Sequence, residues 1–96
     1  MDCIYTITTL YNQEIPKCRC VGYYFDLDVA IKAVLNNDCD IYEFSYKYCV
    51  IEKVKQGLYY FPRDQFWFQW DHEKEGYVQL KEKPNLFKRI GGFGIG

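Results

Sequence analysis

The sequence predicts an α+β fold, in which a twisted, mostly antiparallel sheet of five or six strands carries one helix, at about residues 26–37, on one face. Short runs of β-branched and aromatic residues, separated by turn-forming residues, indicate the strands. One stretch spaces its apolar residues as a helix does. A chain of 96 residues suffices for one domain, so we expect a single domain over 1–96 with a glycine-rich tail at 90–96.

The first half of the chain contains two expected strands and the helix. Residues 3–11 and 19–25 have strand composition, and Gly22 inside the second strand indicates a bulge or a close approach of another backbone. Asp26 is suited to cap the helix, because its carboxylate can accept hydrogen bonds from free N–H groups of the first turn. The apolar stripe that must lie on the sheet consists of Leu27, Ala30, Ile31, Val34 and Leu35. Asn36 and Asn37 are expected to end the helix, since Asn tolerates the left-handed conformation.

The second half alternates strand-like runs with turns. Residues 40–46 and 48–54 are expected to form a central pair of strands that receives the helix. Residues 58–61 make a further extended piece that stops at Pro62. Runs at 66–70 and 76–80 flank a polar loop of hairpin length, and residues 85–88 can form one helical turn.

Composition excludes several classes of function. A net charge of −1 with interspersed basic residues argues against binding to nucleic acid polymers, and no run is apolar enough to span a membrane. Five cysteines without a recognisable export signal indicate reduced thiols in the cytoplasm. Cys18 and Cys20 are separated by one residue, whereas structural zinc sites usually separate their ligands by two, and no second pair exists. We therefore expect neither a metal nor a cofactor.

The residues that could support catalysis are few. His72 is the only histidine and lies in a charged loop, so a cysteine nucleophile has no evident base. Glu43 and Glu52 can meet on neighbouring strands, but paired surface charges are the better explanation for them. The glycines of 91–96 resemble a nucleotide loop, yet a dinucleotide fingerprint requires a helix after them. A docked tail is the better interpretation, and we expect no enzyme.

Binding is the better supported class, because aromatic residues make up 20% of the chain and ten of these are Tyr. Exposed aromatic faces stack on bases or fill pockets of a partner protein. A basic side chain beside them can hold a phosphate or carboxylate. The same faces could instead pair two copies of the chain in a homodimer. The candidate ligand-binding residues are Arg19, Tyr23, Tyr42, Glu43, Tyr46, Tyr48 and Trp67.

From Arg19 onward the chain resembles a family of small uncharacterised proteins from gut-type Gram-positive bacteria and their phages. The resemblance is carried by the motifs DIYE at 40–43, VIE at 50–52 and GFGIG at 92–96, together with the Tyr and Trp residues between them. No activity is associated with the family, so it assigns no site residues. It implies a context, because small cytoplasmic proteins of mobile elements often inhibit or sequester components of host defence.

We therefore expect a non-catalytic, phage-encoded counter-defence protein that sequesters a small nucleotide-like ligand in an aromatic pocket. The alternative is a protein–protein inhibitor or interaction module, directed at a host protein, that uses the aromatic face and the apolar tail.

Overall fold

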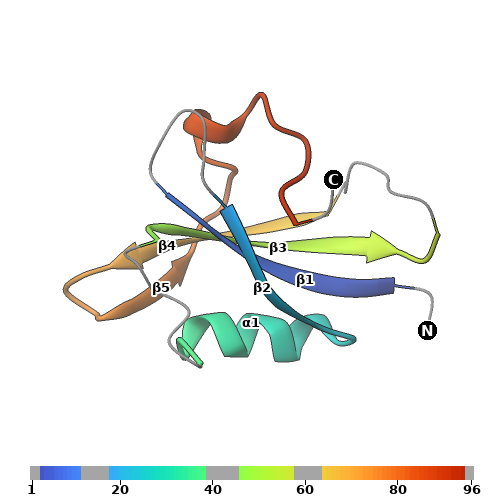
Figure 1. Ribbon diagram of the computed structural model, residues 1–96. Helices are drawn as coiled ribbons and strands as arrows, with labels where there is room; N and C mark the ends of the chain where they lie inside the picture. The colour runs from blue at the N-terminus through green and yellow to red at the C-terminus, as the bar shows by residue number, and fades with distance from the viewer. Residues whose placement is uncertain (1–2, 12–17, 39–45, 58–63, 95–96) are drawn as a thin grey trace.

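The computed structural model describes residues 3–11, 18–38, 46–57 and 64–94, and confirms the predicted α+β fold. Its sheet contains β1 (Cys3–Leu10), β2 (Cys18–Tyr24), β3 (Tyr48–Lys55), β4 (Gln65–Asp71) and β5 (Gly76–Gln79). These strands lie in the order β2-β1-β3-β4-β5, and each neighbouring pair is antiparallel. The helix α1 (Leu27–Leu35) covers one face of the sheet, and the C-terminal segment with the 3₁₀ turn η2 (Asn85–Phe87) covers the other (Figure 1).

The two predicted strands that fall on residues 40–46 and 58–61 lie outside the described residues, except for Tyr46, which precedes β3. The remaining predicted elements are found within one or two residues of their expected bounds. Of the two alternatives at Gly22 the structure shows the bulge, and a Cβ atom there would have no neighbour within 4 Å. Ile7 of β1 pairs with Gly22, whereas Thr8 pairs with Cys20, which leaves Val21 as the extra residue.

Helix α1 begins and ends as its sequence predicts. The Asp26 side chain accepts hydrogen bonds from the backbone N–H groups of Asp28 and Val29, which satisfies donors of the first turn. At the other end Asn37 has a φ of 51°, the left-handed conformation that Asn tolerates after a helix. No helix within the described ranges is both long and apolar enough to cross a membrane.

The sheet separates two apolar clusters. The cluster under α1 consists of Ile7, Ala30, Ala33, Val34, Cys49, Ile51, Phe68 and Tyr77. The cluster on the opposite face consists of Leu10, Val50, Trp67, Phe87 and Phe93. Strand alternation explains this division, because neighbours such as Val50 and Ile51 point to opposite faces of the sheet. The second cluster is completed only by side chains that follow the last strand.

Candidate functional site

The predicted aromatic site is distributed over several parts of the fold. Tyr42 and Glu43 lie outside the described residues. Trp67 is only 3% exposed, and its ring stacks on Phe87 with the centroids 5.3 Å apart and the planes at 12°. Tyr48 is half-buried and meets the edge of the Phe87 ring at 5.2 Å. These two aromatic side chains therefore belong to the apolar cluster on the sheet face opposite α1.

Tyr46 is also buried, and it stacks on Tyr11 with the ring centroids 4.5 Å apart. Its backbone carbonyl accepts a hydrogen bond of 3.0 Å from the Tyr77 hydroxyl. Tyr46 thus connects the approach to β3 with the β4–β5 hairpin.

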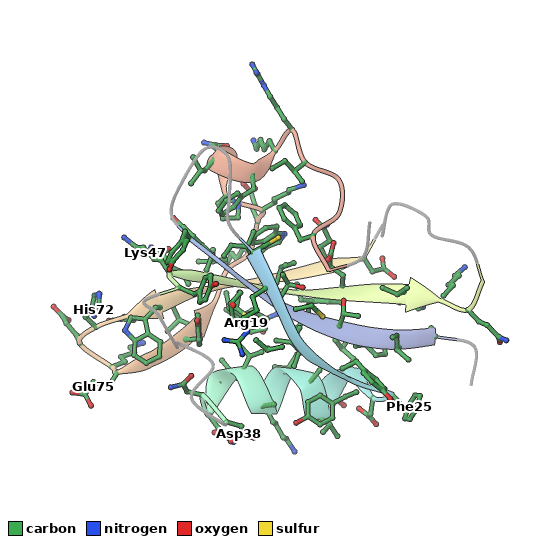
Figure 2. All side chains as sticks on the ribbon, viewed as in Figure 1. Arg19, Phe25, Asp38, Lys47, His72 and Glu75 are labelled. Atoms are coloured by element: carbon green, nitrogen blue, oxygen red, sulfur yellow. The ribbon has the colours of Figure 1, made fainter. Side chains whose placement is uncertain are left out.

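Arg19 and Tyr23 are both exposed, on the edge strand β2. Arg19 pairs with Thr9 and Tyr23 pairs with Thr6, so alternation along β1 places the two side chains on opposite faces of the sheet. Figure 2 shows Arg19 on the side of β2 that faces α1. Tyr23 is 56% exposed and meets Phe25 edge to face at 5.7 Å. The described members of the predicted set therefore do not line one common pocket.

Glu52 carries a buried carboxylate, and the residue is only 1% exposed. One of its oxygens, Oε1, accepts hydrogen bonds from the backbone N–H groups of Phe93 at 3.1 Å and Gly94 at 2.8 Å. The other, Oε2, accepts from the side-chain amide of Gln65 at 2.9 Å. We call residues 91–94 the strap, because Glu52 fastens this segment across the sheet.

Glu52 was not among the predicted site residues, although the sequence contains a signal for it. Alternation places Glu52 on the same face as Val50 and Tyr48, so it is an acid on a largely apolar face. A buried carboxylate requires donors. Here the donors are backbone N–H groups of a glycine-rich segment, which no charge pattern in the sequence indicates.

Glycine is required at one position of the strap. A Cβ atom on Gly94 would lie 2.9 Å from Thr6 Oγ1, 3.0 Å from Thr8 Oγ1 and 3.4 Å from Glu52 Oε1. All three of these residues are buried, and the Thr6 hydroxyl donates to the Glu52 carbonyl at 3.4 Å. The backbone of Gly94 can lie this close to the sheet only because it has no side chain.

Gln65 connects the strap with the body of the sheet. Its side-chain nitrogen Nε2 donates to Glu52 and also to the carbonyl oxygen of Gly91, both at 2.9 Å. Its side-chain oxygen Oε1 accepts from the Trp67 indole N–H at 3.4 Å. Both ends of the amide are therefore engaged, and this fixes its orientation.

Two further side chains lie beside the strap. The Cys18 thiol donates to the Phe93 carbonyl at 3.6 Å, and burial, followed by the charges of Glu52 and Cys20, raises its pKa. The Lys83 ammonium donates to the Ile90 carbonyl and lies 5.4 Å from the centre of the Phe93 ring. Burial lowers the pKa of Lys83, and the negative charge of Glu52 opposes that effect.

A hollow of about 490 Å³ opens where β5 ends beside β4, and we call it the β4 hollow. Two consecutive runs line it, namely Gln65, Phe66 and Trp67, and then Gln79, Leu80, Lys81, Glu82 and Lys83. It therefore combines apolar side chains, two amides and two ammonium groups with one carboxylate. Its volume lies within the roughly 300–1,000 Å³ of small-molecule sites.

Comparison with known proteins gave no assignment. No family model, no curated protein and no solved structure matched the chain.

The described residues also offer little for metal or acid–base chemistry. Within 3–11, 18–38, 46–57 and 64–94, no three side chains of His, Cys, Asp or Glu are grouped so that they could hold a metal ion. His72 lies at the tip of the β4–β5 hairpin (Figure 2), and its Nδ1 accepts a hydrogen bond of 3.2 Å from the Trp70 indole N–H. The β4 hollow, by contrast, places polar and apolar groups side by side at one edge of the sheet.

Proposed function

We propose that this protein is a non-catalytic binding protein that sequesters a small nucleotide-like ligand in the β4 hollow. The single observation that carries the proposal is the composition of the hollow. Phe66 and Leu80 supply apolar surface, Gln79 supplies an amide, and Lys81 supplies an exposed ammonium group. A base requires the first two kinds of group and a phosphate requires the third.

The charge of the hollow favours an anion. Lys81 and Lys83 are opposed there by a single acid, Glu82. Lys83 already donates to the Ile90 carbonyl, so Lys81 is the better placed group to bind a phosphate of an incoming ligand. A charge-assisted hydrogen bond of this kind contributes about 1.5–3 kcal/mol, which corresponds to at least about tenfold in affinity.

Isothermal titration calorimetry tests the proposal, with nucleoside monophosphates, cyclic nucleotides and ADP-ribose as titrants. The protein is first unfolded, dialysed and refolded, so that no ligand from the expression host remains. We expect saturable binding of at least one titrant and about tenfold weaker binding by Lys81→Gln. Lys32→Gln, an exposed change on α1, serves as the matched control and should leave affinity unchanged. An absence of heat with every titrant, in a correctly folded sample, refutes the proposal.

The biological context is part of the same proposal and is supported by the sequence resemblance alone. A phage-encoded protein that acts against host defence would work in the cytoplasm of the bacterial host and remove a nucleotide signal from solution. Expression of the protein in a strain whose defence depends on such a signal should restore plaque formation by a sensitive phage. Lys81→Gln should fail to do so at equal protein level.

A second candidate function, protein–protein association, is favoured by one specific observation. Large apolar side chains are exposed on β2, on the connection to α1 and on the first turn of α1, and they are Val21, Tyr23, Tyr24, Phe25 and Val29. Figure 2 shows Phe25 at the junction of β2 and α1, pointing away from the sheet. Apolar edge strands of this kind tend to pair with another chain.

The partner that fits this edge is a second copy of the chain. Arg19 lies near the start of β2 and Asp26 follows its end, so antiparallel pairing of two β2 strands brings opposite charges together. Tyr23, Tyr24 and Phe25 are 56%, 37% and 55% exposed. At about 200 Å² for each ring these offer roughly 300 Å² per copy, well below the ~800 Å² per partner of a stable complex. Phe93 is only 9% exposed, so the strap adds no apolar surface.

A dimer of this kind must therefore be weak and dependent on concentration. Sedimentation equilibrium from micromolar to millimolar protein should show dimerisation that Tyr23→Lys abolishes, whereas Lys74→Glu on the opposite hairpin leaves it intact. A monomer at every concentration removes this candidate, and a stable complex with a different protein would assign the edge to that partner.

A further inference from the structure

The β4 hollow touches Gln65, Phe66 and Trp67, three consecutive residues of one strand. Successive side chains of a strand point to opposite faces, so a hollow that touches all three must lie against the edge of the strand. At that edge the groups within reach are backbone N–H and C=O groups. The side chain of Gln65 is engaged with Glu52 and Gly91, which leaves its backbone as the polar group that faces the hollow.

The hydrogen bonds of β4 show which backbone groups these are. The Asp64 carbonyl accepts from Lys53 N–H at 3.1 Å, toward β3, and the Trp67 carbonyl accepts from Leu80 N–H at 2.8 Å, toward β5. Backbone groups of successive strand residues point to alternate sides, so those of Gln65 point to the same side as those of Trp67. The partner strand β5 pairs with Phe68–Asp71, and its continuation reaches back only to Trp67.

We propose that the backbone N–H and C=O of Gln65 bind the nucleobase of the ligand through its Watson–Crick edge. This inference rests on the proposed function and specifies how the ligand lies in the hollow. In an extended residue the N–H and C=O point the same way, and a base presents a neighbouring acceptor and donor on that edge. Adenine offers N1 with N6–H, and guanine offers O6 with N1–H.

The surroundings of Gln65 complete this arrangement. Phe66 is partly buried against the cluster under α1, and Leu80 is partly buried against the cluster on the opposite face of the sheet. Apolar side chains therefore flank the base on both of its faces. Lys81 follows Leu80 directly and extends the site toward a phosphate. An extended peptide is the poorer occupant, because in the described part of β4 only one residue, Gln65, offers an unfilled edge, too short for a strand ladder.

The test compares nucleotides with analogues in which methyl groups block the Watson–Crick edge of the base. Nucleoside 5′-monophosphates are titrated by calorimetry against the intact chain, followed by N6,N6-dimethyl-AMP, N1-methyl-GMP and N3-methyl-UMP. The 7-deaza purine nucleotides, which change only the opposite edge of the base, are the controls. We expect each blocked analogue to bind at least about tenfold more weakly than its parent nucleotide, because one hydrogen bond is lost. The affinity of each 7-deaza analogue should lie within about twofold of that of its parent.

Replacement of Gln65 by its α-hydroxy acid provides a test on the protein side. The change removes the backbone N–H and keeps the side chain that holds Glu52. It also turns the Asp64 carbonyl, which accepts from Lys53 N–H, into a weaker ester acceptor, so a thermal melt checks that the fold is intact. We expect about a tenfold loss of affinity for the parent nucleotide. Equal binding of parent and blocked analogues overturns the inference and leaves the proposed function standing. No binding of any nucleotide refutes the proposed function itself.

Discussion

Replacement of Glu52 by Gln tests whether the carboxylate holds the strap in place. The carboxylate accepts hydrogen bonds at both oxygens from the backbone N–H groups of Phe93 and Gly94 and from the amide of Gln65. In Glu52→Gln, one of these oxygens becomes an NH₂ group that faces a donor. Gln65 has no alternative orientation that satisfies its neighbours, because its nitrogen also donates to the Gly91 carbonyl and its oxygen accepts from the Trp67 indole.

The expected cost follows from these contacts. One donor is left unsatisfied in a buried site, which costs about 1–3 kcal/mol, and the remaining bonds lose the assistance of the charge. We therefore expect Glu52→Gln to lower the free energy of unfolding by about 2–4 kcal/mol. For a domain of this size each kcal/mol corresponds to about 4–8 °C in the melting temperature.

Urea denaturation followed by tryptophan fluorescence measures this change, because Trp67 lies in the cluster that the strap covers. Glu73→Gln, an exposed change in the β4–β5 hairpin, is the control and should shift stability by less than about 0.5 kcal/mol. A Glu52→Gln protein as stable as the parent, or more stable, would show that the desolvation cost of the buried carboxylate exceeds the value of its bonds. The view of Glu52 as the fastening point of the strap would then be wrong.

Three further predictions concern the strap, its apolar cluster and pH. Gly94→Ala places a methyl group against Thr6 and Thr8, so the strap should detach from the sheet. Hydrogen exchange at the Phe93 amide should then accelerate by at least about tenfold. Unchanged protection of that amide would contradict the close contact of Gly94 with the sheet. Phe87→Ala removes the ring at the centre of the same cluster and should lower the free energy of unfolding, measured by urea denaturation, by about 3–5 kcal/mol. A decrease below about 1 kcal/mol would contradict a packed core at this position. Burial raises the pKa of the Cys49 thiol, so above about pH 8.5 the unfolded chain releases a proton that the folded chain keeps. The free energy of unfolding should therefore fall by up to about 1.4 kcal/mol per pH unit in urea denaturation at increasing pH. Cys49→Val should remove this part of the pH dependence.

The fold was largely predictable because local patterns determine most of it. The cap at Asp26, the left-handed Asn37 and the bulge at Gly22 each follow from the conformational preferences of a single residue type. Strand alternation likewise separates Val50 from Ile51 and so defines the two faces of the sheet.

The environment of Glu52 was not predictable, because it depends on contacts between residues far apart in the chain. Glu52 and Gly94 are joined by a side-chain to backbone hydrogen bond across 42 positions, and every amide N–H in a chain is an equally eligible donor. The burial of Trp67 has a similar origin, since Phe87 comes from a short turn with almost no periodic signal. An aromatic residue in a strand has the same appearance in the sequence whether it stacks on a ligand or on another side chain.

The two faces of the sheet are completed by different parts of the chain, which has a consequence for the order of folding. The cluster under α1 uses residues up to Tyr77, so that side of the domain can close before residues 87–94 dock. The opposite side needs Phe87 and Phe93, and Glu52 meets its backbone donors only when residues 93 and 94 are in place. A partly folded chain that lacks these contacts exposes Leu10, Val50 and Trp67 to water, and an exposed apolar surface of this kind favours aggregation.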